Sequence, residues 1–250
     1  MFDFKDKIVL ITGGTSGIGE ETARLMVESG AVVCINYSSN DNRAEKLREG
    51  LSKKASIRLY KADVSKEKQV EKMFSAIEKE FSHLDYLVNN VGIDIPDFIE
   101  TYNIDNVRKI IDVNLIGQFI CLKYAIPLLK KSSRPRVINV SSRLGNKPLE
   151  EASAYCCSKA GVNMLTKVAA LELSKYGIRV NTVSPGFTRT PLTEDIFPTE
   201  DEWISAGSSN PSGRVGKPED MANAVLFMLS DYADYINGDN LEVNGGSILK

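Results

Sequence analysis

Short runs of apolar, often β-branched residues alternate along the chain with longer segments in which apolar residues recur three and four positions apart. Runs of the first kind predict strands, and the longer period predicts helices with one apolar face. The expected strands cover residues 7–12, 31–36, 56–60, 86–89, 136–140, 179–183 and 240–243. The expected helices cover residues 20–28, 43–53, 66–81, 104–129, 154–175 and 218–230.

This alternation predicts an α/β fold, with a doubly wound parallel sheet of about seven strands and helices on both faces. No linker, low-complexity tract or fixed repeat divides residues 1–250, so we expect a single domain. The one long irregular stretch covers residues 187–213. In folds of this class, ligands bind outside the carboxyl ends of the strands.

The charge balance limits the range of partners. The chain has 31 Lys and Arg residues and 33 Asp and Glu residues, which gives a formal net charge of −2. A near-neutral chain has no overall attraction to nucleic acid or to anionic lipid. No run of about 18 uninterrupted apolar residues occurs, the length that a membrane span needs. We therefore expect neither nucleic acid nor a membrane as a partner.

The N-terminus and the cysteines indicate a location. Residues 1–7 are polar and lack the basic and long apolar regions of a secretory signal. The four cysteines, Cys34, Cys121, Cys156 and Cys157, show no paired spacing, which fits free thiols in a reducing compartment. These features predict a cytoplasmic protein.

The first chemical signal is the glycine-rich segment TGGTSGIG at residues 12–19, placed where the first strand turns into the first helix. Glycines there let the backbone approach a pyrophosphate, and a helix N-terminus offers unpaired N–H groups and a positive dipole end. The spacing differs from the common GxGxxG pattern, and an ordinary glycine-rich turn is the alternative. The strand-turn-helix setting favours nucleotide binding.

The second signal is Tyr155 with Lys159, four residues apart and therefore on one face of a helix. A nearby ammonium favours the phenolate and lowers the pKa of a tyrosine toward values useful in proton transfer. Ser142 follows the strand at residues 136–140 and brings a hydroxyl to the same edge of the sheet. A surface Tyr and Lys on an amphipathic helix is the alternative interpretation of the pair alone.

Together with several further motifs, these residues resemble the short-chain dehydrogenase/reductase family over essentially the whole chain, with similarity to its 3-oxoacyl-[acyl-carrier-protein] reductase-like members. The motifs that carry the resemblance occur in the family's order: TGGTSGIG at 12–19, Asp63 with Val64, NNVG at 89–92, Asn114, Ser142, Tyr155 with Lys159, Pro185 with Gly186 and Thr190, and YING at 235–238 leading to VNGG at 243–246. Two positions depart from the family pattern: Val91 replaces a usual Ala, and Arg143 replaces a small or apolar residue.

The resemblance implies a Rossmann fold and an enzyme that interconverts a ketone and a secondary alcohol with NAD(P)(H). Tyr155 is then the acid that protonates the carbonyl oxygen, or the base in the reverse direction. Lys159 lowers its pKa and holds the nicotinamide ribose, Ser142 polarises the carbonyl, and Asn114 anchors a water in a proton relay. The cofactor would supply the hydride.

The resemblance also implies a set of residues that bind the cofactor. Asp63 and Val64 match the adenine clamp, Asn90 and Gly92 line the adenosine and ribose region, and Thr190 with the Gly186 turn holds the carboxamide. Capping of the next helix is an alternative role for Asp63, and strand stabilisation is one for Asn90. The full set is Gly13, Thr15, Ser16, Gly17, Ile18, Gly19, Tyr37, Ser38, Ser39, Asp63, Val64, Asn90, Gly92, Tyr155, Lys159, Pro185, Gly186, Thr188 and Thr190.

The end of the second strand bears on the choice between NADP(H) and NAD(H). An NAD enzyme places an acid there to bind the ribose 2′-hydroxyl, but this chain has Tyr37. A 2′-phosphate is then not repelled, and it could accept hydrogen bonds from Ser38, Ser39, Asn40 and Arg43. The arginine that many NADP-dependent members have at the Ser38 position is missing too. The sequence favours NADP(H), with NAD(H) as the alternative.

The substrate should lie under residues 187–213, which resemble the family's mobile lid. We expect Asp94, Ser142, Arg143, Tyr155 and Phe187 at its binding site. Arg143 either binds a carboxylate or phosphate of the substrate or is solvated or ion-paired. A small carbonyl or alcohol is the expected substrate, and it could be linked to CoA or to a carrier protein. Seven basic residues and no acid lie between residues 112 and 150, where a positive face could dock an acidic carrier, although a helix C-terminus that favours cations is the preferred explanation of the run.

Other functions remain as alternatives. An NAD-dependent dehydrogenase of a sugar, polyol, steroid or other secondary alcohol is the rival enzyme, and a catalytically silent dinucleotide-binding sensor is the rival outside enzymes. The single histidine, His83, lies in a connection, which disfavours a hydrolase triad. Cys156 and Cys157 lack the further ligands of a zinc site, so no metal is expected. Residues 104–129 resemble the long helices through which the family forms homotetramers.

Overall fold

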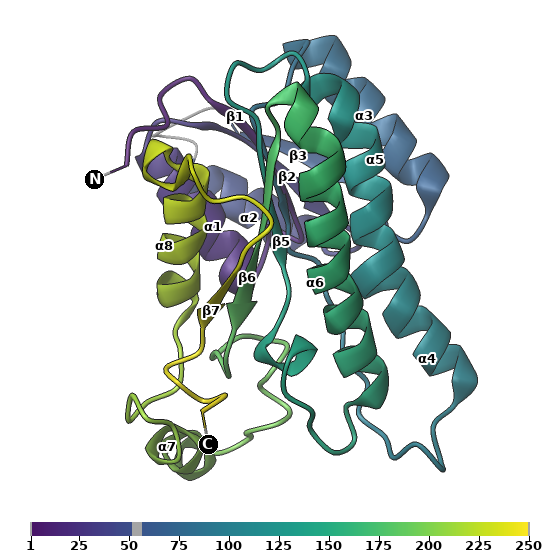
Figure 1. The fold of residues 1–250 in the computed structure, drawn as a ribbon, viewed down its shortest axis with the longest axis vertical. Helices are drawn as coiled ribbons and strands as arrows, with labels where there is room; N and C mark the ends of the chain where they lie inside the picture. Colours follow the sequence, from purple (N-terminus) through teal and green to yellow (C-terminus); the bar gives the residue numbers. More distant parts are fainter. Residues whose placement is uncertain (1, 52–56, 250) are drawn as a thin grey trace.

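Seven parallel strands form a single sheet in the computed structural model, which describes residues 2–51 and 57–249. Their order is β3-β2-β1-β4-β5-β6-β7, so the chain winds outward from β1 in one direction and then from β4 in the other (Figure 1). The strands are β1 (Ile8–Thr12), β2 (Val32–Tyr37), β3 (Ile57–Lys61), β4 (Tyr86–Asn89), β5 (Arg136–Val140), β6 (Arg179–Pro185) and β7 (Asn240–Val243). The expected α/β fold with a doubly wound parallel sheet is confirmed.

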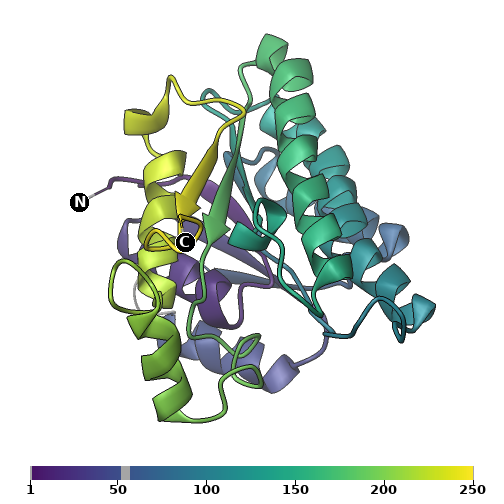
Figure 2. The same ribbon diagram turned by 60° about the horizontal axis from the view of Figure 1, so that its bottom comes forward.

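Helices cover both faces of the sheet (Figures 1 and 2). On one face lie α1 (Gly17–Glu28), α2 (Asp41–Leu51) and α8 (Pro218–Leu229), which form an apolar core with the sheet. On the other lie α3 (Glu67–Phe81), α5 (Gly117–Leu129) and α6 (Ser153–Leu173), which form a second core. The expected ends of the second helix at residues 52 and 53, and the expected start of the third strand at residue 56, lie outside the described residues.

The expected helix at 104–129 is continuous but contains an irregular turn. It consists of α4 (Ile104–Ile111), a π-helical turn at Asp112–Ile116 and α5. Within the described part of the chain, this is the one helix long and apolar enough to cross a membrane, judged by length and composition only. Close to half of its most apolar window is buried inside the molecule, where the helix packs against α3, α6 and β4, and core helices of soluble proteins pass the same test.

The stretch at 187–213 is not wholly irregular as expected, because it contains α7 (Glu200–Ser208). Thr199 caps this helix by accepting a hydrogen bond from the Glu202 backbone N–H, and the Glu202 side chain accepts one from the Thr199 backbone N–H. This reciprocal capping box stabilises a helix start in a segment with few apolar residues. Helix α7 and the C-terminus lie together beyond the carboxyl ends of the strands (Figure 1).

Candidate functional site

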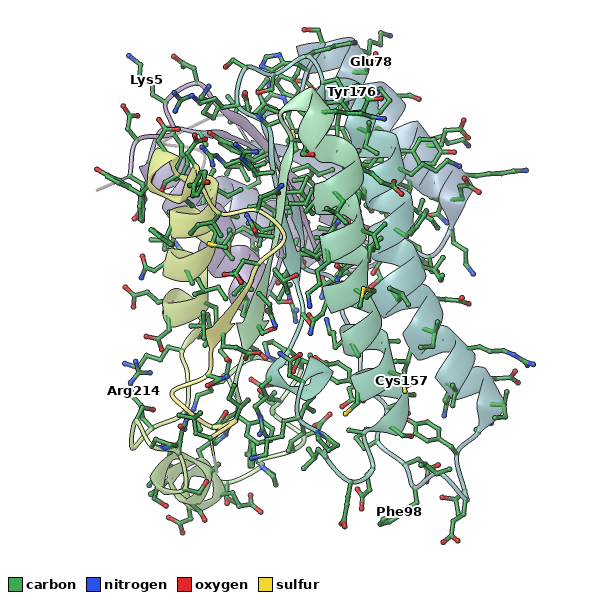
Figure 3. The ribbon with its side chains drawn as sticks, in the orientation of Figure 1. Lys5, Glu78, Phe98, Cys157, Tyr176 and Arg214 are labelled. Carbon is green, nitrogen blue, oxygen red and sulfur yellow. The ribbon has the colours of Figure 1, made fainter. Side chains whose placement is uncertain are left out.

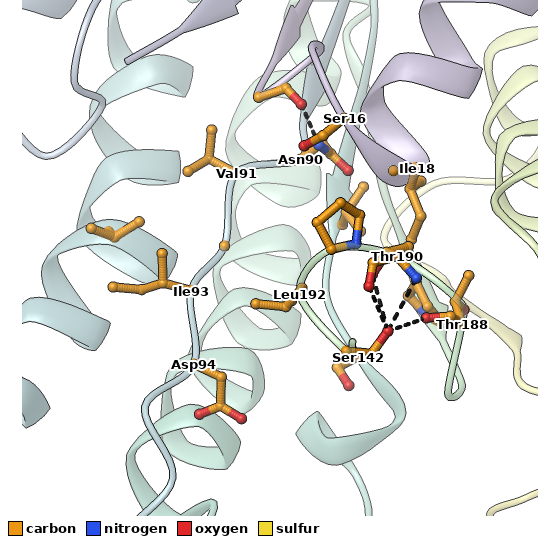
Figure 4. A pocket seen from close by; sticks show the side chains of 18 of the residues that line it. Ser16, Ile18, Asn90, Val91, Ile93, Asp94, Ser142, Thr188, Thr190 and Leu192 are labelled. Carbon is orange, nitrogen blue, oxygen red and sulfur yellow. Dashed lines mark hydrogen bonds between the residues drawn. The ribbon is translucent and has the colours of Figure 1, made fainter. Parts of the chain in front are cut away.

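A cavity of about 520 Å³ opens at the carboxyl edge of the sheet, between the glycine-rich turn and the segment after β6 (Figure 4). Nearly all of the residues predicted for cofactor and substrate binding line it, although they come from seven separate segments of the chain. Lining residues among them are Gly13, Thr15, Ser16, Gly17, Ile18, Tyr37, Ser38, Ser39, Asp63, Val64, Asn90, Gly92, Asp94, Ser142, Arg143, Tyr155, Lys159, Pro185, Gly186, Phe187, Thr188 and Thr190. Two predicted residues, Gly19 and Asn114, do not line this cavity.

The glycine-rich turn presents an uncapped helix N-terminus to the cavity. Ser16 is the N-cap of α1, and its side chain makes no capping hydrogen bond. Ser16, Gly17 and Ile18 all line the cavity, so the free backbone N–H groups of the first turn lie beside it. Such a terminus suits the pyrophosphate of a dinucleotide, and the residues therefore fit the expected cofactor.

Gly19 serves this turn by its lack of a side chain. A Cβ at this position would overlap the carbonyl oxygen of Gly13 and would lie 2.5 Å from Nδ2 of Asn90. Asn90 Nδ2 donates to the carbonyls of Thr12 and Gly13, and its backbone N–H donates to Oγ1 of Thr12. Asn90 thus ties β4 to the glycine turn while also lining the cavity, so its structural role is confirmed and its contact with the cofactor stays a prediction.

Asp63 also combines a structural contact with a place on the cavity wall. Its Oδ1 accepts hydrogen bonds from the backbone N–H and the hydroxyl of Ser65, at 2.9 and 2.7 Å. The N-cap of α3 is Lys66, so Asp63 orders the turn before the helix and is not its cap. The capping role considered for Asp63 is therefore wrong, because the carboxylate reaches only the second residue of the turn.

Tyr155, Lys159 and Ser142 meet at the centre of the cavity. All three side chains are buried, and Lys159 is only 2% exposed. The Lys159 ammonium donates to the carbonyl of Val140 at 3.0 Å and lies 5.5 Å from the centre of the Tyr155 ring. Oγ of Ser142 accepts a hydrogen bond from the Leu144 backbone N–H at 3.1 Å, so its own proton remains available to a ligand or to Tyr155.

Burial dominates the acid–base properties of this group. It raises the pKa of Tyr155, the charge of Asp94 raises it further, and the hydrogen bond from Ser142 lowers it. Burial lowers the pKa of Lys159 to about 8, and the charge of Asp94 raises it. Burial likewise raises the pKa of Asp94 itself. In the chain without a cofactor the pKa of Tyr155 is thus raised, with burial of the phenol as the largest cause, and the expected lowering of this pKa by Lys159 stays a prediction.

Asn114 supports the same group from behind the cavity. It lies in the π-helical turn, and its amide makes two hydrogen bonds with the Ile93 backbone, donating to the carbonyl at 2.9 Å and accepting from the N–H at 2.8 Å. Nδ2 also donates to Oγ of Ser158, which in turn donates to the carbonyl of Tyr155. Asn114 thus connects the loop after β4 to the helix that carries Tyr155. Its expected contact with a water stays a prediction.

At the far end of the cavity, the end of β2 carries no free carboxylate. Asp41 follows at the start of α2, but it pairs with Lys61 at 2.8 Å. A hydrogen bond with Tyr37 also lowers the pKa of Asp41, after the larger effect of Lys61. Arg43 lines the cavity beside Ser38. Hydroxyls and the Arg43 guanidinium thus line the cavity here, while Asp41 already pairs with Lys61.

The segment after β6 covers the cavity and is fixed by aromatic contacts. The rings of Phe187 and Phe197 pack edge to face with their centres 5.0 Å apart, and Phe197 packs on Trp203 of α7 at 4.7 Å. Thr193 holds the turn, because its Oγ1 donates to the carbonyls of Thr188 and Thr190. Leu192 and Ile196 contribute apolar lining.

The seven basic residues between 112 and 150 do not form one positive face. Lys123, Lys131 and Arg134 pair with Glu67, Glu78 and Asp231. Lys130 stacks on the Tyr176 ring at 3.6 Å, and Figure 3 shows Tyr176 and Glu78 at the amino end of the sheet, far from the cavity. Arg136 is buried beside Asp231 and Asp234, while Arg143 and Lys147 lie near the carboxyl edge. The single positive face that was considered as a docking surface for an acidic carrier is therefore not formed, because folding separates these residues.

Several lining residues were not predicted. Asn36, Ile93, Lys109, Val113, Leu144 and Thr193 reach the cavity from the ends of strands and helices. Their position beside known motifs was the only signal in the sequence, since Ile93 directly follows the NNVG motif and Thr193 closely follows Thr190. His83 is distant, with Nδ1 3.0 Å from the Phe81 carbonyl oxygen. Among residues 2–51 and 57–249, no group of three or more His, Cys, Asp or Glu residues is placed to hold a metal.

Comparisons with known proteins place this geometry among enzymes. A family model described as enoyl-(acyl carrier protein) reductase matches residues 13–247. The 3beta-hydroxysteroid dehydrogenase 1 of Eggerthella lenta is 36% identical over 249 residues, covering 99% of this chain and 95% of that protein. The 3-oxoacyl-[acyl-carrier-protein] reductase FabG of Thermotoga maritima is 34% identical over 97% of this chain and 98% of its own length. The NADP active-site complex of Pseudomonas aeruginosa RhlG superimposes with a TM-score of 0.93, at 30% identity over 98% of each chain.

Proposed function

The chain belongs to the short-chain dehydrogenase/reductase family, and on that premise we propose that it is an NADP(H)-preferring oxidoreductase that reduces a ketone to a secondary alcohol. One observation carries the proposal: the hydroxyls of Ser142 and Tyr155 and the ammonium of Lys159 share one cavity with an uncapped helix N-terminus. A catalytically silent sensor would not need this set of reacting groups.

The roles of the catalytic residues follow from their protonation states. The nicotinamide, when bound, supplies a hydride to the carbonyl carbon. Tyr155 has a raised pKa and so keeps its proton at neutral pH, ready to transfer it to the carbonyl oxygen. Ser142 can donate to that same oxygen, because the Leu144 N–H already occupies its acceptor side. Lys159, with a pKa of about 8, is mostly charged at pH 7 and stabilises developing negative charge.

Asn114 acts as a positioning residue in this proposal. Its bonds to Ile93 and Ser158 fix the loop after β4 against the helix that carries Tyr155. The Tyr155 hydroxyl is thereby held in a fixed position at the cavity, where it would act on a substrate beside the bound cofactor. Preorganised donors of this kind need no rearrangement during the reaction.

Preference for NADP(H) is supported by the end of β2. Tyr37, Ser38 and Ser39 line the cavity where an NAD enzyme would place an acid, and Asp41 is neutralised by Lys61. A 2′-phosphate then meets hydroxyls and the Arg43 guanidinium without a free carboxylate that would repel it. NAD(H) is the alternative, and a direct comparison of the two cofactors decides between them.

The substrate class is proposed from the relatives and the segment at 187–213. FabG of Thermotoga maritima is named for 3-oxoacyl chains on a carrier protein, which supports a 3-oxoacyl thioester or a similar ketone, either free or linked to CoA or a carrier. The Eggerthella lenta relative is named for steroids, which favours a secondary-alcohol dehydrogenase as the second candidate. In both cases residues 187–213 act as the lid, with Phe187, Leu192 and Ile196 as its inner surface.

A homotetramer in the cytoplasm completes the proposal. Five apolar side chains on the outer face of α5, α6 and the π-helical turn are 42–78% exposed: Ile116, Phe119, Met164, Val168 and Leu171. A patch of this kind favours burial against another copy of the chain. Light scattering should give four chains for the wild type and a smaller particle for Phe119→Glu. All four cysteines are free, which fits a reducing compartment.

A fluorescence titration tests the cofactor preference, and a single variant tests the chemistry. NADPH should quench Trp203 at lower concentration than NADH, since Trp203 packs on the lid residue Phe197. Tyr155→Phe should lose more than 99% of ketone reduction while its NADPH affinity stays within about threefold of the wild type. Tighter binding of NADH would overturn the cofactor preference, and substantial activity in Tyr155→Phe would remove Tyr155 as the acid.

A further inference from the structure

Arg143 is a buried cation that has no counter-ion among the residues that the structure describes. It directly follows Ser142, lines the cavity and is only 9% exposed. Within residues 2–51 and 57–249, no carboxylate or carbonyl oxygen hydrogen bonds to its guanidinium or forms an ion pair with it. Its one specific contact is with the ring of Phe187, whose centre lies 4.3 Å from Cζ. Arginines that are buried in proteins are normally paired, so an unpaired one in a cavity points to a ligand.

The stacking on Phe187 leaves the donors of Arg143 free. A guanidinium that lies over an aromatic ring uses its face, whereas its five N–H groups radiate in its plane. Phe187 is itself held edge to face by Phe197, at an angle of 90°, and Phe197 packs on Trp203. The guanidinium is therefore held against a rigid aromatic surface. Preorganisation of this kind lowers the entropy cost of binding an anion.

Because no residue in the described part of the chain pairs with the Arg143 guanidinium, its charge is destabilised in the folded protein. Burial lowers the pKa of Arg143, because a charge removed from water is destabilised. A carboxylate that enters the cavity restores the lost interaction by accepting two parallel N–H bonds from the planar guanidinium. Other cations around the cavity are less suited to this task. Lys159 is bonded to the Val140 carbonyl, and Lys109 is an exposed residue at the cavity wall.

We propose that Arg143 binds a carboxylate carried by the substrate itself, so that this enzyme acts on oxo acids and the corresponding hydroxy acids. The inference rests on the proposed function, because it concerns the substrate of the same site. Arg143, Ser142 and Tyr155 line the same cavity of about 520 Å³, so an acid held by Arg143 must be compact for its keto group to reach Ser142 and Tyr155. Leu144, Leu192 and Ile196 provide apolar walls for its carbon skeleton.

Two substrates that differ in charge distinguish carboxylate binding by Arg143 from a purely structural role of this residue. The probes are 4-oxocyclohexanecarboxylate and its methyl ester, which share a ring and a ketone and differ in charge. With NADPH, Arg143→Met should lower kcat/KM for the acid by about 10- to 100-fold, as expected for losing a charge-assisted hydrogen bond, and change that of the ester by less than threefold. Met retains apolar contact with Phe187. Arg179→Met is the control, because Arg179 lies at the opposite edge of the sheet and donates to the Asp234 carbonyl.

Equal losses for acid and ester would overturn the proposal, since they would assign Arg143 to structure. A preference of the wild type for the ester would also overturn it. A binding measurement distinguishes failure of the proposed carboxylate site from failure of the proposed function. In the presence of NADP⁺, cyclohexanecarboxylate should bind the wild type at least tenfold more tightly than cyclohexanecarboxamide, and Arg143→Met should abolish the difference. Binding without selectivity refutes the carboxylate site even if neither ketone is reduced, whereas selective binding without reduction refutes only the proposed reaction.

Discussion

Replacement of Lys159 by methionine should stabilise the folded chain while abolishing its activity. The ammonium is 2% exposed, and burial lowers its pKa from 10.5 to about 8. Each tenfold change in proton affinity is worth about 1.4 kcal/mol, so the charged form is destabilised in the folded state by about 3 kcal/mol. Methionine fills a similar volume without a charge. We expect the free energy of unfolding at pH 7 to rise by about 1–3 kcal/mol.

The hydrogen bond lost in this variant should cost little. Lys159 donates to the Val140 carbonyl, but Nε2 of Gln118 donates to the same oxygen at 3.2 Å and remains. The carbonyl is therefore still satisfied in Lys159→Met. A chain of this length gains about 2–4 °C in Tm for each kcal/mol, which is easily measured. Unfolding should be followed without cofactor and at constant protein concentration, since ligands and assembly shift apparent stability.

The pH dependence of the stabilisation supplies the sharper test. Below pH 8 the lysine is charged in both states, so the folded wild type carries the full penalty. Between pH 8 and 10.5 the folded chain releases this proton before the unfolded chain does, and the wild type gains stability relative to the variant. The advantage of Lys159→Met should therefore shrink as the pH rises toward 10. Lys167→Met on the same helix is the control, because Lys167 is exposed and should change stability by less than about 0.5 kcal/mol. A destabilised Lys159→Met, or an advantage that grows with pH, would refute the reasoning.

Three further changes test other parts of the site. Gly19→Ala places a Cβ against the Gly13 carbonyl, so it should lower the affinity for NADPH by at least tenfold. Denaturant unfolding should show a loss of stability of about 1–3 kcal/mol. An unchanged NADPH affinity would contradict the close packing at Gly19. Asp94→Asn removes a charge that raises the pKa of Lys159, so in the pH profile of ketone reduction the alkaline limb should move to lower pH. A shift of this limb to higher pH would contradict the effect of Asp94 on Lys159. Thr199→Ala removes the capping box of α7, a loss of about 1 kcal/mol that should speed hydrogen exchange in residues 200–208 but not in α8.

Most of the fold could be predicted because parallel strands buried on both faces are short and almost wholly apolar. β1 shows this directly, since all of its residues are buried and four of the five are apolar, whereas β5 is equally buried but includes Arg136 and Asn139. The boundaries of both strands were predicted within one residue. Helix α7 was missed because acidic residues dominate its first turn, and its buried residues are only Trp203 and Gly207. The pattern Thr199-x-x-Glu202 was present in the sequence and marks a helix start, so this helix could have been found from its cap.

The site was predictable where a motif fixes a residue on a known edge of the sheet. Tyr155, Lys159 and Ser142 lie where the strand and helix pattern placed them. The protonation of Tyr155 was not predictable, because burial by neighbours from distant segments determines it. The same limit applies to Arg143, whose stacking on Phe187 joins residues far apart in the chain. Sequence spacing fixes which groups share an element, whereas burial and charge pairing depend on how the elements pack.

The π-helical turn at Asp112–Ile116 makes the position of Asn114 depend on chain length. In this turn the Gly117 N–H donates to the Asp112 carbonyl, five residues back instead of four. The turn thus contains one residue more than an α-helix would, and α4 and α5 are rotated relative to each other by about 100° compared with a regular helix. Deletion of a single residue here would leave the helix intact but turn Asn114 away from Ile93. An insertion or deletion in this helix therefore rotates the residues on either side of it relative to each other about the helix axis. Such a change can remove Asn114 from the site without altering any residue that touches the substrate.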